Sequence, residues 1–359
     1  MSHICPRSIK SDRLLTAPGW NQKTRNALES LILTGSRKRL PVVFDLDNTL
    51  VCGDVGEAVL AVLAGAGVLT PGRLSVALCP PLNTPGRGRV TIGSCGDIME
   101  YYEAFLAPTV HGRGDPTPLA NGYVWATEVL EGLRLGEVIQ ATRKAFEFSR
   151  PGQVRLLSVT PGKTSFPAPF FYPEMVELVG CLLRHEFEIW IVSASNVWSV
   201  RWMVLHGLNP GLRRLGFKSA IRPDHVIGIS TLLSDSAARL YKDSVLVRED
   251  LRYATMAATH MRTLHLTAQL QFPVPVYSGK VGCIFDAIGR EPYLCVGDSE
   301  ADHPMLTISR NRLWIARLDK PEAQKATKAL MKRTGSETWM IQAVRTRDNP
   351  GFVSEPCCC

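Results

Sequence analysis

The sequence predicts an α/β protein with a doubly wound, mostly parallel sheet and an inserted helical cap. Strand-like and helical segments alternate along the chain, which is the pattern of a parallel sheet with right-handed crossovers. Three of the strand-like runs end in polar or acidic residues, and such sheets bind their ligands at the carboxyl ends of strands. A mostly helical segment, 53–172, lies between two of these strands.

These patterns divide the chain into a core in two pieces with a cap between them. We expect an N-terminal helical extension over 1–39, the α/β core over 40–52 and 173–335, the cap over 53–172 and a C-terminal tail over 336–359. The 359 residues suffice for one large α/β domain with an insertion, or for two domains.

In the first half of the chain, helical spacing and turn residues set the expected elements. Segment 20–34 is a helix because Leu28, Leu31 and Ile32 share a face. The apolar run that begins at Pro41 predicts a buried strand. Glycine and proline make 66–95 a loop with one short strand. The other expected elements are helices over 54–64, 97–107, 123–133 and 135–148, and a strand-like run over 154–159.

In the second half, strands and helices alternate more regularly. Pro173 fits the first turn of a helix, and 187–195 is a β-rich run with few polar residues, as a buried parallel strand should be. Gly207 is expected to end the next helix. Within 218–278, 225–230 resembles a strand and 247–268 fits either a strand or a helix. After it we expect a helix at 279–289, strands at 291–299 and 312–318, and a helix at 321–333.

Composition restricts the class of protein. No stretch approaches the roughly 20 consecutive apolar residues of a membrane span, and the N-terminus lacks the apolar run of a secretory signal. The ten cysteines contain no CxxC pair, so we expect a cytoplasmic protein without zinc or disulfides. The terminal triplet 357–359 is either a frayed tail or a lipidation site, although Pro356 breaks the C-a-a-X pattern.

The formal net charge is +8, and the excess lies at the two ends of the chain. A basic end is either a solvated face or an attraction for phosphorylated substrates or nucleic acid. Aromatic residues are not interleaved with the basic ones, so we expect no stable nucleic-acid complex.

The stretch FDLDNTL, 44–50, carries the chemistry. Asp45 and Asp47 crowd two carboxylates at the end of a buried strand, where each raises the pKa of the other and a divalent cation relieves the repulsion. Mg²⁺ takes carboxylate oxygens and is completed by substrate phosphate. One carboxylate can then attack phosphorus to give an aspartyl-phosphate, and the other can protonate the leaving oxygen and activate water.

Three later segments supply groups that fit this scheme. Ser193 ends the second strand and can donate a hydrogen bond to phosphate, and Lys280 brings a compact positive charge in the first turn of its helix. Asp298 ends another strand, and Asp302 follows four residues later, so both suit a metal ion or a metal-bound water. We expect Ser195 and Asn196 to cap the next helix.

The order of FDLDNT, a strand ending in Ser193, Lys280 and GDSEAD resembles the haloacid dehalogenase superfamily of phosphohydrolases. The helical insertion and GDSEAD are similar to its phosphoserine-phosphatase-like branch, and SASNVWSV with YSGKV and VGDSEADHPML is similar to members acting on phosphocholine-type substrates. The resemblance covers about 40–58, 173–210 and 274–318.

The resemblance implies a Rossmann-like core and a Mg²⁺-dependent phosphomonoesterase for a small phosphorylated metabolite. It makes Asp45 the nucleophile and Asp47 the acid and base, and the aspartate at 47 argues against dehalogenation. It implies that Thr49, Ser193 and Lys280 hold the substrate phosphate, and that the metal is held by Asp45, Asp298, Asp302 and the backbone carbonyl of Asp47.

The same resemblance points to the substrate's other end. In the related branch an acidic residue shortly after the first motif contacts a cationic substrate group, and Asp54 and Glu57 stand in that region. Four aromatic residues of the cap either form a surface for a quaternary ammonium or pack the cap's own helices: Tyr101, Tyr102, Tyr123 and Trp125.

Two other functions stay open at this point. One is a phosphotransferase that passes the phosphoryl group from the same aspartyl-phosphate to an alcohol. The other is a non-catalytic, nucleic-acid-associated protein dominated by its basic ends; a steep loss of affinity with salt would support it, and the complete motif set argues against it.

Overall fold

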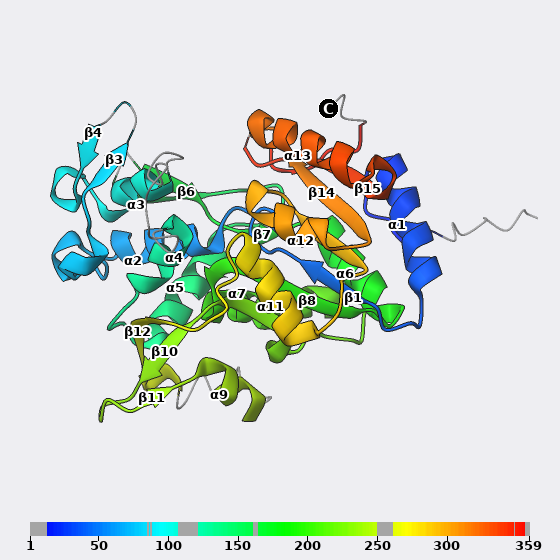
Figure 1. Cartoon of the computed structure of the whole chain (residues 1–359). Helices are drawn as coiled ribbons and strands as arrows, with labels where there is room; N and C mark the ends of the chain where they lie inside the picture. The colour runs from blue at the N-terminus through cyan, green and yellow to red at the C-terminus, as the bar shows by residue number, and fades with distance from the viewer. Residues whose placement is uncertain are drawn as a thin grey trace, which may run out of the picture.

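The computed structural model describes residues 13–84, 86, 88–106, 121–160, 164–249, 261–347 and 349–355. Within these residues, the centre of the molecule is a seven-stranded sheet that is parallel except at one edge (Figure 1). The predicted mostly parallel α/β sheet is confirmed. Its strands, in sheet order, are β16 (Gly351–Phe352), β15 (Trp339–Arg345), β14 (Asn311–Arg317), β13 (Leu294–Gly297), β1 (Pro41–Phe44), β8 (Glu188–Asn196) and β9 (Val226–Ile229).

The two faces of the sheet pack into separate hydrophobic cores. Side chains alternate along a strand, so Val42 and Phe44 of β1 enter one core and Val43 enters the other. Among the helices of the first core are α1 (Gln22–Gly35) and α6 (Pro173–Arg184). The second includes α11 (Ser278–Ile288), α12 (His303–Thr307) and α13 (Pro321–Thr334). Helices therefore cover both faces, which confirms the doubly wound arrangement.

The register of the central strands aligns their carboxyl ends. Phe44 of β1 lies opposite Val296 of β13 on one side and Ile191 of β8 on the other. The next residue, Asp45, donates its backbone N–H to the carbonyl of Val296 at 2.9 Å. Asp298 and Ser193 each follow two residues after these partners, so the three strands deliver polar side chains to one edge.

The cap leaves and rejoins the core through a short antiparallel pair, β2 (Val51–Cys52) and β7 (Phe170–Phe171). It is mostly helical, as predicted, and it also holds two hairpins where sequence patterns indicated one short strand each. Its helices are α2 (Val55–Gly65), α3 (Ile98–Leu106), α4 (Gly122–Glu128) and α5 (Leu135–Phe148); its hairpins are β3 (Leu82–Thr84) with β4 (Gly88–Val90), and β5 (Leu156–Thr160) with β6 (Thr164–Pro167).

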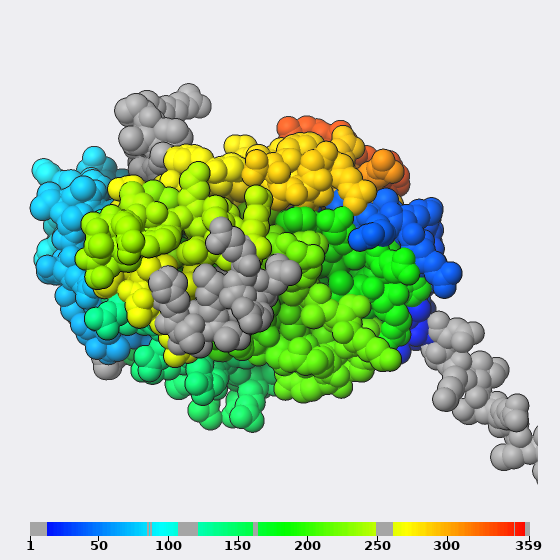
Figure 2. Space-filling view, turned by 90° about the horizontal axis from the view of Figure 1, so that it is seen from below, coloured from blue at the N-terminus to red at the C-terminus, as the bar shows by residue number. Residues whose placement is uncertain are grey.

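The expected core segment 173–335 contains a second insertion, described over residues 230–249 and 261–275, which contacts both the cap and the core. On the core side, Asp243 forms a buried ion pair with Arg201 at 2.8 Å. The backbone of Leu266 donates to Leu133 at 2.9 Å, and that of Leu135 donates to Leu264 at 2.8 Å. Figure 2 shows its yellow-green atoms beside the cyan atoms of the cap. The described part of the insertion includes β10 (Thr231–Ser234), β11 (Leu240–Tyr241), α9 (Asp243–Glu249) and β12 (His265–Leu270).

The expected C-terminal tail is part of the sheet as far as the structure describes it. Strand β15 runs parallel to β14, and its Gln342 is fully buried. The Gln342 side chain accepts a hydrogen bond from the backbone of Asn21 at 2.9 Å and donates one to the carbonyl of Val353 at 3.0 Å. The N-terminal segment is thereby fastened to the last strands. The terminal cysteines, 357–359, lie outside the described residues.

Gly207 does not end a helix, contrary to the sequence-based expectation. The chain stays helical through α7 (Val197–Met203), a π-helical turn and α8 (Asn209–Arg214). A Cβ atom at Gly207 would lie 2.6 Å from the ring of Phe171. This glycine therefore serves close packing. Across the described ranges, every helix is too short or too polar to span a bilayer.

Candidate active site

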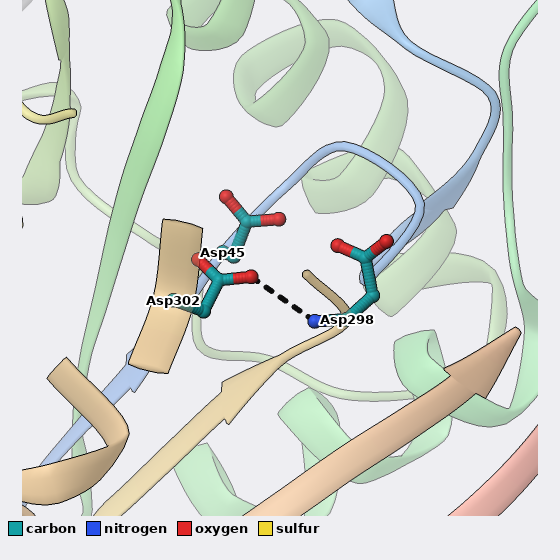
Figure 3. Close-up of side chains that lie close together, drawn as sticks. All are labelled: Asp45, Asp298 and Asp302. Atoms are coloured by element: carbon teal, nitrogen blue, oxygen red, sulfur yellow. Dashed lines mark hydrogen bonds between the residues drawn. The ribbon is translucent and has the colours of Figure 1, made fainter. Parts of the chain in front are cut away.

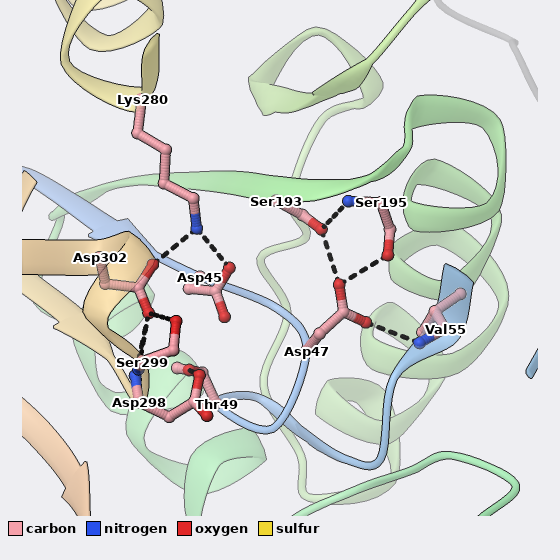
Figure 4. A network of polar contacts seen from close by, with 10 residues as sticks. All are labelled: Asp45, Asp47, Thr49, Val55, Ser193, Ser195, Lys280, Asp298, Ser299 and Asp302. Carbon is pink, nitrogen blue, oxygen red and sulfur yellow. Dashed lines mark hydrogen bonds and ion pairs between the residues drawn. The ribbon is translucent and has the colours of Figure 1, made fainter. Parts of the chain in front are cut away.

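At the carboxyl edge of the sheet, one lysine joins two aspartates from different segments (Figure 4). Lys280 Nζ lies 2.7 Å from Asp45 Oδ1 and 2.6 Å from Asp302 Oδ1, and all three side chains are buried. Burial and the neighbouring carboxylates raise the pKa of Asp45, although Lys280 opposes this. Burial disfavours the charged lysine, but Asp302 and Asp45 outweigh it and raise the pKa of Lys280.

Asp302 has partners on both carboxylate oxygens. Oδ1 faces Lys280, and Oδ2 accepts hydrogen bonds at 3.1 Å from the backbone of Asp298, the backbone of Ser299 and the Ser299 hydroxyl. A side chain at Gly297 would collide with Asp302, since a Cβ there would lie 2.6 Å from its Cβ. The sequence GDSEAD thus folds into a turn that fixes Asp302 beneath the lysine.

Asp298 has a different environment, between a hydroxyl and a guanidinium. Thr49 Oγ1 donates to its Oδ1 at 3.3 Å, and Arg317 donates to its Oδ2 at 3.2 Å. Burial raises the pKa of Asp298 to about 8, with Arg317 opposing and Asp302 and Asp45 adding to the rise. Buried carboxylates this close together repel one another, and a bound cation would relieve the repulsion.

The donor set fits a hard divalent cation. Asp45, Asp298 and Asp302 each offer an oxygen, and these oxygens lie within 4.8 Å of one another (Figure 3). Oxygen-only ligands suit Mg²⁺, which keeps several waters and binds through few carboxylates. The carboxylate of Asp47 is not part of this cluster.

Asp47 instead points towards the cap side of the site. Its Oδ2 accepts hydrogen bonds from the hydroxyls of Ser193 at 2.9 Å and Ser195 at 2.8 Å, and its Oδ1 accepts the backbone N–H of Val55 at 2.7 Å. Burial raises the pKa of Asp47 to about 7, and the charge of Asp54 adds to this, while the hydrogen bonds oppose it. Asp45 and Asp47 therefore lie at the same strand end but have separate partners.

The loop after Asp47 is a tight turn that aims the two aspartates apart. The carbonyl of Leu46 accepts the backbone N–H groups of Thr49 and Leu50 at 3.2 and 2.9 Å, and Asn48 takes a left-handed φ of 56°. Gly53 has a φ of 87° and returns the chain towards α2. Helix α2 begins one residue after Asp54, its N-cap, so the first motif leads directly into the cap.

Asp54 and Glu57 lie at the start of α2, next to a small pocket. Asp54 accepts the backbone N–H of Glu57 at 2.9 Å, and both side chains are partly exposed. Burial raises the pKa of each to about 7; Glu57 adds to the rise at Asp54, and Asp47 adds to the rise at Glu57. The pocket is lined by Asp54, Gly56, Tyr102, Tyr123, Ala126, Thr127, Ala194, Ser195 and Asn196.

The four aromatic residues of the cap divide into two pairs. Tyr101 and Trp125 pack inside the cap: the Tyr101 hydroxyl donates to the carbonyl of Pro80, and the Trp125 indole donates to that of Leu78 at 2.7 Å. Tyr102 and Tyr123 line the pocket instead. Packing within the cap is thus confirmed for Tyr101 and Trp125, and Tyr102 also stacks on Trp125. A surface for a quaternary ammonium stays a prediction for Tyr102 and Tyr123.

Three residues have positions that the sequence did not predict. Asn196 caps α7 as expected, but Ser195 donates to Asp47 and accepts the backbone N–H of Gly56 at 3.1 Å, so it links β8 to α2. The hydroxyl of Thr49 donates to Asp298, and its contact with the substrate phosphate stays a prediction. Arg317 is a third such residue: it ends β14 and donates to Asp298. A charged residue at the end of an apolar strand is the same signal that identified the aspartates.

Comparisons with known proteins agree with this geometry. No protein-family model matches the chain. It is 24% identical over 349 residues to the phosphorylcholine phosphatase of Pseudomonas aeruginosa, covering 90% of both proteins. The predicted resemblance to haloacid dehalogenase-like phosphatases is confirmed. That relative is a phosphatase, and the alignment with it extends over nearly the whole of both proteins. The prediction of a phosphatase is therefore confirmed as well.

Two solved structures extend the comparison of folds. A conserved protein of unknown function from Anaerococcus prevotii superposes with a TM-score of 0.64 and 18% identity, covering 96% of this chain and 98% of that one. The two proteins therefore share one fold, with both insertions inside the superposed length. A had family hydrolase from Salmonella enterica serovar Typhi superposes with a TM-score of 0.41 and 12% identity, covering 87% and 77% of the two chains.

Proposed function

We propose that this chain is a Mg²⁺-dependent phosphomonoesterase that acts through an aspartyl-phosphate on Asp45. The observation that supports it best is the contact of Lys280 with both Asp45 and Asp302, at the strand edge where Asp298 completes an all-oxygen cluster. Segments more than 200 residues apart in the sequence meet there with the charges that phosphoryl transfer requires.

The proposed reaction has two steps on the same aspartate. A carboxylate oxygen of Asp45 forms a bond to phosphorus while the bond from phosphorus to the alcohol oxygen breaks, and Asp47 gives that oxygen a proton. Water then attacks phosphorus, Asp47 takes its proton, and Asp45 is regenerated with release of phosphate. Mg²⁺, when bound, supplies positive charge to the carboxylates and to the phosphoryl oxygens.

The remaining residues hold these groups in place. Lys280 keeps the Asp45 carboxylate oriented, and Asp302 keeps Lys280 oriented. We propose that Ser193, whose hydroxyl donates to Asp47, offers this hydroxyl to a phosphoryl oxygen when substrate is bound. We propose that the backbone carbonyl of Asp47 serves as a metal ligand and that Thr49 orients Asp298.

We propose a small phosphomonoester with a cationic alcohol, of the phosphorylcholine type, as the substrate. Support comes from the pocket beside Asp47, which combines the carboxylate of Asp54 with the rings of Tyr102 and Tyr123. Carboxylates and aromatic rings together recognise quaternary ammonium groups. The relative matched over 90% of both chains is a phosphorylcholine phosphatase.

We also propose a cytosolic location, on an independent observation. Among the residues that the structure describes, five cysteines are free thiols: Cys52, Cys79, Cys181, Cys283 and Cys295. Unpaired cysteines are typical of a reducing compartment.

The test is a phosphate-release assay with a panel of phosphomonoesters and Mg²⁺. We expect phosphorylcholine to exceed phosphoserine and a neutral sugar phosphate in kcat/KM, and activity to vanish with chelator and return with Mg²⁺. Metal binding is measured separately, as a Mg²⁺-dependent rise in Tm that Asp298→Asn removes. Full activity in metal-free buffer would refute the mechanism, and added alcohols that capture the phosphoryl group would favour a phosphotransferase.

A further inference from the structure

The residue at position 277 adopts a backbone conformation that a tyrosine rarely takes. Tyr277 has φ 50° and ψ −121°, and the backbone of Gly279 donates to the carbonyl of Val276 at 2.9 Å. Residues 276–279 therefore form a type II′ turn with Tyr277 at its first central position, where glycine is strongly preferred. A side chain in this region of φ/ψ space is strained, and such strain concentrates at functional sites.

The same turn contains Gly279, which is required by a close contact and not by a left-handed backbone conformation. A Cβ atom at Gly279 would lie 1.8 Å from the carbonyl oxygen of Val274. The sequence thus has glycine at the position of closest approach but keeps a large side chain at the position whose dihedral angles favour glycine. This contrast indicates that the phenol ring of Tyr277 has a role of its own.

The turn lies between the cap and the catalytic lysine. Val274 and Val276 pack in one cluster with Val124 and Tyr123 of α4, and the carbonyl of Tyr277 accepts the backbone N–H of Lys280 at 3.1 Å. The Tyr277 side chain is 46% exposed. It therefore stands at a solvent-accessible border of the site, next to the cap helix that carries a pocket residue.

The packing of Val274 and Val276 against α4 brings the turn towards Tyr123, which lines the pocket beside Asp54. Burial raises the pKa of Tyr123, and electrostatic repulsion from Asp54, Tyr277 and Glu57 raises it further. Burial also raises the pKa of Tyr277, with a contribution from Glu300. Tyr277 is thus within electrostatic range of Tyr123 on the cap side and of an acid on the core side.

We infer that Tyr277 is a specificity-determining residue whose strained turn holds its ring against the cationic end of the substrate. The ring forms the core-side wall of the entrance, across from Tyr123, and binds the ammonium group through its π face. This inference rests on the proposed function, because it needs a cationic leaving group. A purely structural role, in which the turn only begins α11, would leave substrate preference unchanged.

The experiment measures preference and strain in the same variants. Preference is the ratio of kcat/KM for phosphorylcholine to that for 3,3-dimethylbutyl phosphate, which has the same shape without the charge. The variants are Tyr277→Phe, which keeps the ring, and Tyr277→Ala and Tyr277→Gly, which both remove it. Ala238→Gly is the control, since Ala238 is exposed and has a φ of 58° in a turn of the second insertion.

We expect the ratio to fall by about 3- to 10-fold in Tyr277→Ala and Tyr277→Gly, mainly through KM, and to stay within twofold in Tyr277→Phe and Ala238→Gly. Because only glycine relieves the backbone strain, Tyr277→Gly should melt above Tyr277→Ala by about 2–4 °C.

Three results would overturn the inference, each in a distinguishable way. An unchanged ratio in both ring-less variants, in a parent that prefers phosphorylcholine, would refute the role of Tyr277 alone. A Tm for Tyr277→Gly at or below that of Tyr277→Ala would refute the strain. A parent without preference between the two esters would refute the proposed substrate class together with the role of Tyr277, whatever the two melting temperatures show.

Discussion

The charged side chains on the two sides of the site differ in burial and in ion pairing. On the core side, Asp45, Asp302 and Lys280 are at most 4% exposed and neutralise one another in hydrogen-bonded ion pairs. On the cap side, Asp54 and Glu57 are partly exposed, and neither forms an ion pair with a residue that the structure describes. The charges of the core side are thus balanced within the protein, whereas the carboxylates of the cap side have no cationic ion-pair partner among the described residues when they ionise.

The largest effects are expected from substitutions on the core side. These substitutions distinguish the proposed roles of Asp45 and Asp47. Asp45→Asn keeps the shape but removes the proposed nucleophile, so no phosphoenzyme should form. Asp47→Asn keeps the nucleophile and should lose 10²–10⁴-fold in kcat, with less loss for aryl phosphates, whose leaving groups need little protonation. Rapid-quench labelling with phosphate-labelled substrate measures both, and the aspartyl-phosphate should persist longer in Asp47→Asn.

Two results would contradict this assignment. A labelled Asp45→Asn enzyme would mean that another group attacks phosphorus. An Asp47→Asn enzyme that hydrolyses alkyl phosphates at the parent rate would mean that the proton comes from elsewhere.

The next effect breaks the cap side while leaving the core side intact. Asp54→Asn keeps the helix cap, and Glu57→Gln keeps the side-chain size, but each removes one negative charge beside the pocket. We expect KM for phosphorylcholine to rise roughly tenfold with little change in kcat, because the interaction is present in ground and transition states alike. Steady-state kinetics against 3,3-dimethylbutyl phosphate provide the comparison.

Glu128→Gln is the matched control for these two variants. Glu128 is a partly buried acid of the cap helix α4 that does not line the pocket. Equal KM changes in all three variants would show that general loss of cap charge, and not recognition at the pocket, causes the effect.

A smaller effect is expected on the pH dependence of KM, and it again distinguishes the cap side from the core side. Burial raises the pKa of Asp54 and of Glu57 to about 7, so each carboxyl loses its negative charge as the pH falls through 7. We therefore expect KM for phosphorylcholine to rise about threefold more than KM for its neutral isostere between pH 8 and pH 6. The charged and titratable groups that act on these two acids are Asp47, Glu103, Asp298, Arg317 and Lys320.

The double variant Asp54→Asn with Glu57→Gln should abolish this difference between the two esters. Ionisation of the phosphate itself affects both esters equally and cancels in the ratio. Parallel pH profiles for the two esters in the parent enzyme would contradict the assignment of these acids.

The smallest effect concerns the stability of the cap alone. Asp97 accepts hydrogen bonds from the hydroxyls of Thr160 and Thr164 and from the backbone of Met99 and Glu100. Burial raises its pKa, but these hydrogen bonds lower it more, so the net pKa lies below the usual value. The stabilisation is present above the unfolded-state pKa near 4 and is lost as the pH falls through the folded-state pKa.

Asp97→Asn should therefore lower the free energy of unfolding by about 0.5–1 kcal/mol at pH 7, after allowance for solvent screening, and the difference should disappear towards pH 3. Urea unfolding at several pH values measures this. Asp286→Asn, at an exposed site on α11, is the control and should show no such dependence.

The sequence predicted the core side well because its signals are local. Acids at the ends of apolar strands are conspicuous, and parallel strands bring their carboxyl ends to one edge, so Asp45, Ser193 and Asp298 could be joined without coordinates. Strand β15 was missed because Gln342 looks like a surface residue, whereas it is fully buried and satisfied by backbone groups of distant segments.

The cap side was harder to predict because its contacts depend on tertiary structure. The link from Ser195 to Asp47 and to the backbone of Gly56 joins two insertion points that no local pattern relates. The second insertion is similar in this respect, since part of its attachment is made by backbone hydrogen bonds of Leu133 and Leu135 with Leu264 and Leu266. Backbone pairing between remote segments leaves little trace in residue type.

The strand order has a consequence for synthesis on the ribosome. Strand β1 pairs with β8 on one side but with β13, Leu294–Gly297, on the other. A nascent chain that ends before residue 294 contains the first motif, both insertions and Lys280, yet one edge of β1 has no partner and Asp45 has no Asp298 beside it. The catalytic edge can close only when most of the polypeptide has emerged, so the growing chain carries an open strand edge that invites wrong pairing until then.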